Sequence, residues 1–195
     1  MNSRNGEDIL LKLRETGALL EGHFLLSSGN HSGYYLQCAR FLQYPWNAQE
    51  AGKKIAEALK PLEPDCVVSP ALGGVIIGHE TARFLGVPFL FTERESGRIS
   101  LRRFSLEGPA RVVIVEDVVT TGRSTREAAD AVSDIPGVEW VGVGCIVDRS
   151  AGGHGLPEFF RSLVKVDFPV YAPDQCPLCR TDIPLVKPGS RRTVS

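Results

Sequence analysis

The segment of this chain best equipped for chemistry joins two adjacent carboxylates to a run of hydroxyl residues. Glu116 and Asp117 follow an apolar stretch, and residues 116–125 read Glu-Asp-Val-Val-Thr-Thr-Gly-Arg-Ser-Thr. Ionised carboxylates accept hydrogen bonds from neighbouring hydroxyl groups, as on ribose, and they also suit a hydrated Mg²⁺. Hydroxyl side chains and exposed backbone N–H groups around a glycine suit a phosphate monoester. Phosphate and ribose side by side indicate a sugar phosphate.

A helix that begins inside this run should strengthen the anion site. Ser124 and Glu127 have the spacing of a capping box, so we predict that the helix starts there and directs the positive end of its dipole at the hydroxyl groups. The alternative is a solvated strand end followed by an ordinary capped turn. A P-loop and a dinucleotide site are excluded, because the run lacks the G-x-x-x-x-G-K-[ST] lysine and the chain has no strand-anchored G-x-G-x-x-G.

Alternating helices and short apolar strands must position this run. The periodicity predicts helices over 45–59, 75–84 and 124–132 and strands over 66–69, 88–91, 111–115 and 141–147. The strands are continuously apolar, which is typical of a sheet covered on both faces. We therefore predict an α/β fold with a doubly wound, mainly parallel sheet flanked by helices. Ligands of such sheets bind beyond the carboxyl ends of the strands.

A single domain in three parts should hold all 195 residues. Residues 1–44 are expected to form a small N-terminal hood, with a helix over 7–16 and extended runs over 19–26 and 34–38. Residues 45–150 are the α/β core. Residues 151–195 are a C-terminal extension that carries a cysteine pair.

The overall composition argues against several classes of partner. A formal net charge of −1 gives no field that would gather nucleic acid or an anionic membrane surface. No stretch approaches the roughly 18 apolar residues of a membrane span, and charges at Arg4, Asp8 and Lys12 interrupt any signal-peptide core. We expect a cytoplasmic protein whose five cysteines are reduced thiols rather than a disulfide framework.

The run from Val112 to Thr125 resembles the phosphoribosyl pyrophosphate (PRPP) signature of the type I phosphoribosyltransferases. The order of elements from Leu20 to Arg149 resembles, more narrowly, the orotate phosphoribosyltransferase family. The resemblance implies transfer of the phosphoribosyl group of PRPP to orotate, giving orotidine 5'-phosphate and diphosphate, with Mg²⁺ held mainly through the substrate. A transferase of the same type for purines or other bases stays open. So does a non-catalytic PRPP-sensing regulator, although the chain shows no helix-turn-helix extension.

The same resemblance assigns roles to individual residues. Glu116 and Asp117 would orient the ribose near the metal. The expected PRPP contacts are Val118, Val119, Thr120, Thr121, Gly122, Arg123, Ser124 and Thr125, with Leu72 and Gly73 in the pyrophosphate loop. The expected orotate contacts are Tyr34, Tyr35 and Leu36 in the hood, Thr120, and Arg149, whose guanidinium suits a carboxylate.

An arginine-rich loop over 93–103 completes the expected site. By resemblance its four arginines neutralise diphosphate in the neighbouring subunit of a homodimer, with a catalytic role for the last two; they are Arg94, Arg98, Arg102 and Arg103. The alternative is a solvated charged hairpin. Typical relatives carry one lysine where this chain has Ser27, another where it has Leu72-Gly73-Gly74, and lysine with histidine in the loop, where this chain has only arginines. The group that protonates the base or the leaving group is therefore open, because arginine stays charged.

Cys176 and Cys179 have the C-x-x-C spacing of half a zinc site. The sequence contains no second C-x-x-C, and it does not show whether the other three cysteines contribute. The spacing leaves zinc open but favours two free thiols on the C-terminal extension.

Overall fold

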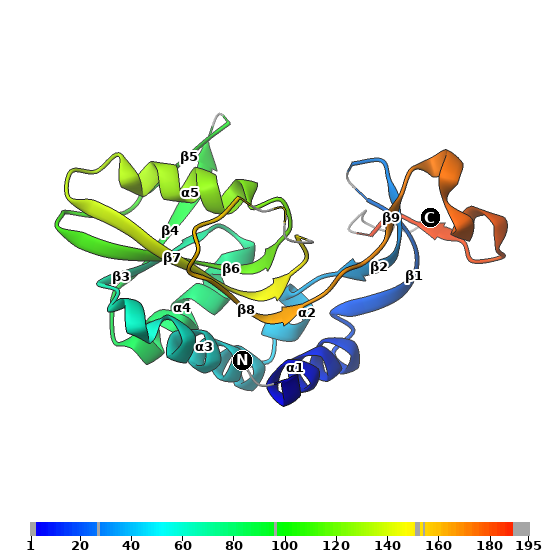
Figure 1. Ribbon diagram of the computed structural model, residues 1–195, viewed down its shortest axis with the longest axis horizontal. Coiled ribbons are helices and arrows are strands. Elements are labelled where there is room, and N and C mark those ends of the chain that lie inside the picture. The colour runs from blue at the N-terminus through cyan, green and yellow to red at the C-terminus, as the bar shows by residue number, and fades with distance from the viewer. Residues whose placement is uncertain (1–2, 27, 96, 151–152, 154, 189–195) are drawn as a thin grey trace, which may run out of the picture.

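The strands of the chain form two separate sheets, seen on the left and right of Figure 1. The structure is a computed structural model that describes residues 3–26, 28–95, 97–150, 153 and 155–188. The larger sheet has six strands in the order β5-β4-β3-β6-β7-β8, and the smaller one has four in the order β10-β1-β2-β9. Among the described residues, no helix combines the length and apolar character needed to cross a membrane.

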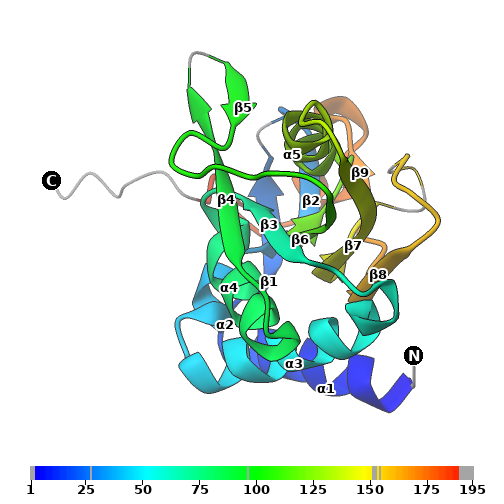
Figure 2. The same cartoon turned by 90° about the vertical axis from the view of Figure 1, so that its left-hand side faces the viewer.

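The six-stranded sheet forms the core and is parallel except at one edge. Its strands are β3 (Cys66–Pro70), β4 (Phe89–Glu95), β5 (Arg98–Ser100), β6 (Ala110–Val119), β7 (Val138–Asp148) and β8 (Phe160–Lys165). Only the β4–β5 pair is antiparallel, and this hairpin rises from the sheet edge in Figure 2. The short edge strand β5 was not predicted from the sequence.

Both faces of the core sheet are covered by helices, as the continuously apolar strands predicted. Helices α3 (Pro45–Leu59) and α4 (Gly73–Leu85) cover one face, where Val113 and Val115 of β6 are fully buried. Helix α5 (Arg123–Ser133) covers the other face, where Val112 and Ile114 lie. Successive residues of β6 thus point to opposite faces, and each finds an apolar layer. The predicted doubly wound α/β fold is confirmed.

The hood is built from both ends of the chain. Its N-terminal elements are α1 (Ser3–Glu15), β1 (Leu19–Leu25), β2 (His31–Leu36) and α2 (Ala39–Leu42). The C-terminal extension adds β9 (Val170–Tyr171), the 3-10 turns η2 (Pro173–Gln175) and η3 (Pro177–Arg180), and β10 (Leu185–Val186). Strand β9 pairs with β2 and strand β10 with β1, so the extension borders both edges of the β1–β2 hairpin (Figure 1).

The described part of the C-terminal extension predicted over 151–195 contributes strands to both sheets. Strand β8 completes the core sheet beside β7, and β9 and β10 belong to the hood sheet. Helix α1 packs on the core through Ile9 and Leu13, in one cluster with Leu163 of β8. The extension ties hood and core together, and a boundary at residue 150 cuts through the core sheet.

Candidate functional site

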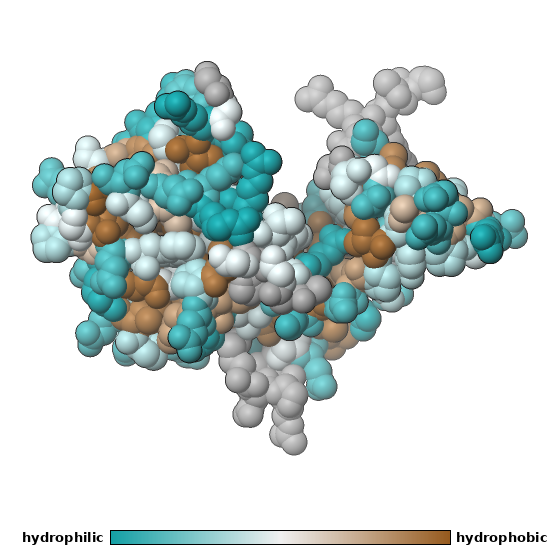
Figure 3. Space-filling model, turned by 45° about the horizontal axis from the view of Figure 1, so that its top comes forward, coloured by the Kyte–Doolittle hydropathy of each residue, from teal (hydrophilic) through white to brown (hydrophobic). Residues whose placement is uncertain are grey.

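A cavity of about 730 Å³ lies between the hood and the carboxyl ends of the core strands. Figure 3 shows the molecule hollowed between these two lobes, with hydrophilic residues on the core side. The hood contributes Tyr35, the core Thr120, Thr121 and Arg149, and the extension Phe168 and Lys187. Ligands of doubly wound sheets bind at this position.

Glu116 and Asp117 lie within strand β6 rather than after it. The predicted strand ended at Val115, but β6 continues to Val119 because it pairs with β7 as far as Asp148. The two carboxylates consequently point to opposite faces of the sheet. Glu116 is buried against α5, where its carboxylate accepts a hydrogen bond of 2.7 Å from the Thr125 hydroxyl.

Asp117 faces Gly73, the first residue of α4. Its Oδ1 accepts a hydrogen bond of 2.9 Å from the Val118 N–H. This glycine approaches so closely that a Cβ built on it would lie 2.8 Å from the same Oδ1, so a side chain there would collide with the carboxylate. Gly73 thus packs directly against the Asp117 carboxylate. The neighbouring Leu72 is 85% exposed.

Burial controls the ionisation of both carboxylates. It raises the pKa of Glu116 to about 7, an effect that the neighbouring Asp117 charge reinforces and the Thr125 hydrogen bond opposes. Burial likewise raises the pKa of Asp117 above its usual value. Two carboxyls of this kind favour a cation or hydroxyl groups nearby, because either would stabilise their ionised forms.

Replacing Glu116 by glutamine should stabilise the fold at about pH 8 and leave it unchanged at about pH 4. The folded chain holds the Glu116 proton up to a pKa of about 7, whereas the unfolded chain releases it near 4.5. The free energy of unfolding therefore falls as the pH rises between these values, by about 3 kcal/mol at most. Urea unfolding at both pH values measures the difference, with the exposed Glu107→Gln as control. A benefit independent of pH would contradict a buried, protonated Glu116.

A second, smaller cavity of about 50 Å³ is formed by the loop that follows β6. It is lined by Glu116 and by Val118, Val119, Thr120, Thr121, Gly122, Arg123, Ser124 and Thr125. Helix α5 begins here without a hydrogen bond from a side-chain cap, so the N–H groups of its first turn are suited to an anion. Thr120 and Thr121 line both cavities, which places the two binding spaces next to each other.

The predicted capping box is wrong. Gly122 occupies the N-cap position with φ of 69°, a left-handed conformation that glycine adopts readily, and the helix begins at Arg123. Glu127 cannot serve the cap because its carboxylate accepts a hydrogen bond of 2.9 Å from Arg123 and also pairs with Arg94. Glu127 instead forms surface ion pairs with Arg123 and Arg94.

The three hood residues expected to contact the base are divided between two environments. Tyr35 lines the larger cavity. Tyr34 and Leu36 pack against the apolar core, and the Tyr34 ring stacks on Phe168 at 4.4 Å between centroids. Phe168 itself lines the cavity, so Tyr34 supports the wall from behind. The sequence pointed to the right strand but not to the face that meets the cavity.

Arg149 follows β7 and lines the larger cavity, as expected from its place after a strand. Its guanidinium carbon lies 5.8 Å from the centroid of the Phe168 ring. Burial lowers the pKa of Arg149, but arginine remains charged at neutral pH. The cavity therefore presents a half-buried cation beside an aromatic ring.

The arginine-rich loop does not meet this site within one chain. Its residues form the β4–β5 hairpin, where Arg103 donates to Glu93 at 2.6 and 3.1 Å and Arg102 lies 3.4 Å from Glu95. Arg94 pairs with Glu127, and Arg98 is exposed. None of these arginines lines either cavity. Within a single chain, the loop has the conformation of the charged hairpin that was the alternative.

Several features of the site were missed from the sequence. Phe168 and Lys187 reach the larger cavity from the C-terminal extension, next to strands of only two residues each, β9 and β10. Strands this short leave no readable periodicity.

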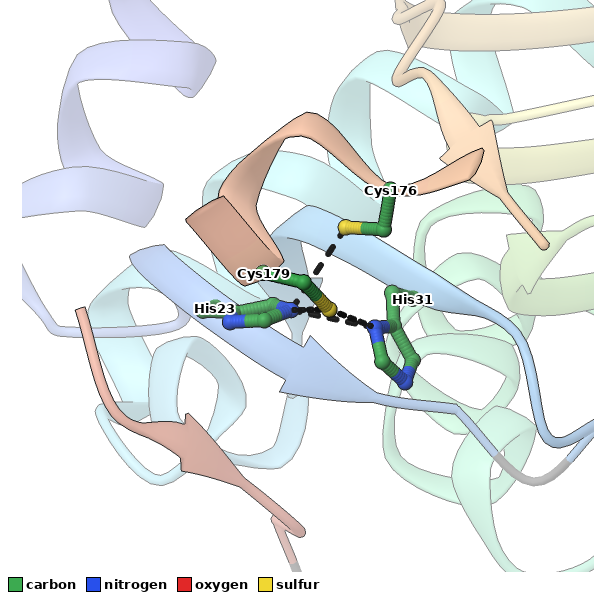
Figure 4. A group of neighbouring side chains, drawn as sticks. All are labelled: His23, His31, Cys176 and Cys179. Atoms are coloured by element: carbon green, nitrogen blue, oxygen red, sulfur yellow. Dashed lines mark hydrogen bonds between the residues drawn. The ribbon is translucent and has the colours of Figure 1, made fainter. Parts of the chain in front are cut away.

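Cys176 and Cys179 do not line the larger cavity. They lie against β1 and β2 beside two histidines that no sequence motif links to a metal (Figure 4). Ser27 lies outside the described residues.

Known proteins resemble this chain along most of its length. Residues 44–155 match the family model described as "Phosphoribosyl transferase domain". An orotate phosphoribosyltransferase of Thermotoga maritima is 48% identical over 182 residues, which cover 92% of this chain and 96% of the relative. The orotate phosphoribosyltransferase of Mycobacterium tuberculosis, solved with inorganic phosphate, has a TM-score of 0.67 and 26% identity, covering 84% of this chain and 96% of that one. The same enzyme solved with PRPP has a TM-score of 0.62 and 26% identity, covering 80% and 94%.

Proposed function

This chain belongs to the orotate phosphoribosyltransferase family, and on that premise we propose that it transfers the phosphoribosyl group of PRPP to orotate, giving orotidine 5'-phosphate and diphosphate. The observation that carries the proposal is the pair of adjoining cavities. The smaller one, at the start of α5, suits the 5-phosphate, and the larger one holds Arg149 and Tyr35 for an anionic, planar base. Thr120 and Thr121 line both, so one sugar phosphate can reach from one to the other.

The protein must position the two substrates and stabilise the charges that develop during the reaction. A ring nitrogen of the base forms a bond to the anomeric carbon while the bond from that carbon to the diphosphate oxygen breaks. Positive charge develops on the ribose and negative charge on the leaving group, so no serine or cysteine nucleophile is required. Asp117 and Glu116 are assigned to the ribose, and the loop from Thr120 to Thr125 to the 5-phosphate.

Mg²⁺ fits the donors at this site. The carboxylates of Glu116 and Asp117 offer hard oxygen atoms on opposite faces of β6, and burial makes a cation favourable beside either one. When bound with PRPP, the ion would neutralise charge on the diphosphate. The carboxylates would then orient the ribose hydroxyls and the hydration shell of the ion, rather than donate a proton.

We also propose a homodimer in which the β4–β5 hairpin serves the neighbouring subunit. The hairpin arginines lie outside both cavities of their own chain, and their ion pairs are exposed to solvent. Exposed pairs contribute only about 0–1 kcal/mol, so a diphosphate can displace the glutamates. A second chain is the source of these arginines that best agrees with their position at the sheet edge.

A direct assay tests the proposed reaction. The purified chain is incubated with PRPP and Mg²⁺ and with orotate, adenine, hypoxanthine, guanine or uracil in turn. We expect turnover with orotate. The loss of orotate absorbance and the release of diphosphate measure this turnover. Turnover of a purine with none of orotate would overturn the assignment of the base while leaving the phosphoribosyl transfer intact.

Replacing Arg149 by alanine should weaken the orotate side of the reaction selectively. The change leaves a carboxylate of the base without its cation in a half-buried site. It should lower kcat/KM for orotate by a factor equivalent to roughly 2 to 5 kcal/mol of lost transition-state stabilisation. The Kd of PRPP should stay within about twofold of the original. Steady-state kinetics with orotate and calorimetry with PRPP give the two values.

The matched control is Arg161→Ala. Arg161 also lies over a phenylalanine ring, with its guanidinium carbon 3.9 Å from the centroid of Phe159, but it does not line the larger cavity. Neither kcat/KM for orotate nor the Kd of PRPP should change in this variant. Equal weakening of orotate and PRPP in Arg149→Ala would contradict a role for Arg149 on the base.

A further inference from the structure

Four side chains that can bind a metal meet on one face of the hood (Figure 4), and none of them lines the larger cavity. They are His23 of β1, His31 of β2, and Cys176 and Cys179 beside and within the turn η3. One donor atom from each lies within 4.8 Å of all the others. We propose that these four residues hold a structural zinc ion, which fastens the C-terminal extension to the hood.

The spacing of the donor atoms agrees with a tetrahedral zinc site. Zinc binds nitrogen at about 2.0–2.1 Å and sulfur at about 2.3 Å, so two nitrogen ligands lie about 3.4 Å apart and a nitrogen and a sulfur about 3.6 Å apart. His23 Nε2 lies 3.1 Å from His31 Nδ1 and 3.5 Å from Cys176 Sγ. Cys179 Sγ lies 3.2 Å from His31 Nδ1 and 3.7 Å from His23 Nε2. An ion can therefore bind with little movement of the side chains.

The backbone explains why these four residues converge. Leu25 and His31 are paired directly across the β1–β2 hairpin, and the register of the pairing shifts between Glu21 and Phe24, where His23 lies. The two histidine rings meet on one face of the hairpin, with His23 Nε2 3.1 Å from His31 Nδ1. The cysteines are brought onto that face by the segment between β9 and β10, which border opposite edges of the hairpin. The tight turn at η3, in which the Cys179 N–H donates to the Cys176 carbonyl at 3.3 Å, brings the two cysteines together.

A second interaction fixes the orientation of one histidine. His23 Nδ1 lies 3.3 Å from the carbonyl oxygen of Ile183, so this nitrogen carries the proton and donates to the carbonyl. Its Nε2 then presents a lone pair to the other three donors. Histidines that bind metal in proteins usually make such a hydrogen bond through the second ring nitrogen. Two cysteines and two histidines fill all four positions, as in structural rather than catalytic zinc sites.

The extension has little else to hold its fold. Among its described residues after Val166, Cys176 is the only buried one, with 3% of its surface exposed. The two strands that border the hairpin have two residues each. Apolar burial of this extent cannot offset the entropy of ordering such a segment, which is the situation in which small folds rely on a metal. A zinc ion bound by both the hairpin and η3 supplies the missing stabilisation.

The proposed ion also bears on the larger cavity. Phe168 and Val170 line the cavity before the cysteine turn, and Lys187 lines it after β10. The extension between them is joined to the hairpin through the four donors. Zinc therefore holds one wall of the cavity in place without touching a ligand there.

Metal analysis of the chain, purified without an affinity tag and without added zinc, tests the site. We expect one zinc per chain, retained during dialysis. Cys176→Ala and Cys179→Ala should each contain less than about a fifth of that amount, because an incomplete set of ligands binds zinc weakly. Cys66→Ala is the matched control, since Cys66 is buried in β3, and it should keep its full zinc. Less than a tenth of a zinc per wild-type chain, even after dialysis against zinc, would overturn the proposal, as would stoichiometric iron.

Cobalt substitution gives an answer that needs no variant. Wild-type chain stripped by a chelator should take up one Co²⁺ and show the strong visible bands of tetrahedral cobalt together with thiolate-to-metal charge transfer. Zinc should displace the cobalt and remove both features. The weak spectrum of octahedral cobalt, or no uptake, would exclude the four residues as a tetrahedral site.

Limited trypsin digestion tests the fastening role. Stripped wild-type chain should be cut after the exposed Arg180 at least about tenfold faster than the zinc-bound chain, because cleavage requires local opening of the extension. Added zinc should restore the slow rate in the wild type and in Cys66→Ala, but not in Cys179→Ala. Equal rates with and without zinc would show that the ion does not hold the extension.

Discussion

Replacing Asp117 by asparagine should lower turnover by about a hundredfold or more and leave the fold intact. The carboxylate of Asp117 lies at the far end of β6, half-buried and held by the Val118 N–H. Asparagine keeps the shape and can accept the same hydrogen bond, but it removes the charge to which we assign the stabilisation of positive charge on the ribose. Because burial raises the pKa of Asp117, losing that charge should not destabilise the fold.

The control for this variant is Asp134→Asn. Asp134 is exposed at the other end of α5, so the same chemical change there should leave turnover unaffected. Thermal unfolding and circular dichroism verify that both variants are folded, and steady-state kinetics with saturating PRPP, orotate and Mg²⁺ give kcat. A folded Asp117→Asn chain with a near wild-type rate would refute the assignment of Asp117 to the ribose.

The core sheet and the position of the small cavity after β6 could be predicted from the sequence because their signals are local. An apolar strand followed by carboxylates, hydroxyls and one glycine indicates both the sheet edge and the loop that lines this cavity. The errors in this region come from tertiary pairing. Strand β6 is longer than predicted because β7 extends beside it. Glu127 does not cap the helix because its carboxylate pairs with Arg94 of β4, a strand far away in the sequence.

The hood could be predicted only in part, because its contacts join residues far apart in the chain. The run over 34–38 correctly indicated an extended segment, but only the sheet pairing shows that Tyr35 faces the cavity while Tyr34 stacks on Phe168. The separation in sequence also hid the group of four metal-binding side chains. His23 and Cys176 are 153 residues apart, so the C-x-x-C motif read alone indicates half a site and favours free thiols.

Restored activity in mixed dimers is expected if the hairpin acts on the neighbouring subunit. Two inactive variants are mixed under conditions of subunit exchange: Asp117→Asn, and the double change Arg102→Ala with Arg103→Ala. In a mixed dimer, one site combines an intact Asp117 with an intact hairpin from the partner. Random pairing of equal pools makes half of the dimers mixed, with one working site in each, so up to roughly a quarter of the wild-type activity should return.

The control mixture pairs Asp117→Asn with a triple variant that carries Asp117→Asn and both arginine changes. Neither pool then has an intact Asp117, so no activity should return whichever chain supplies the hairpin. The structure favours the trans arrangement because the hairpin lies at the edge of the sheet, with β3 and β4 between β5 and the carboxylates of β6. Arg102 and Arg103 pair with Glu95 and Glu93 at the surface, and an incoming diphosphate can replace these two carboxylates at little cost. Demonstrated subunit exchange without recovery in the first mixture would place the hairpin in its own site, or remove these arginines from the reaction altogether.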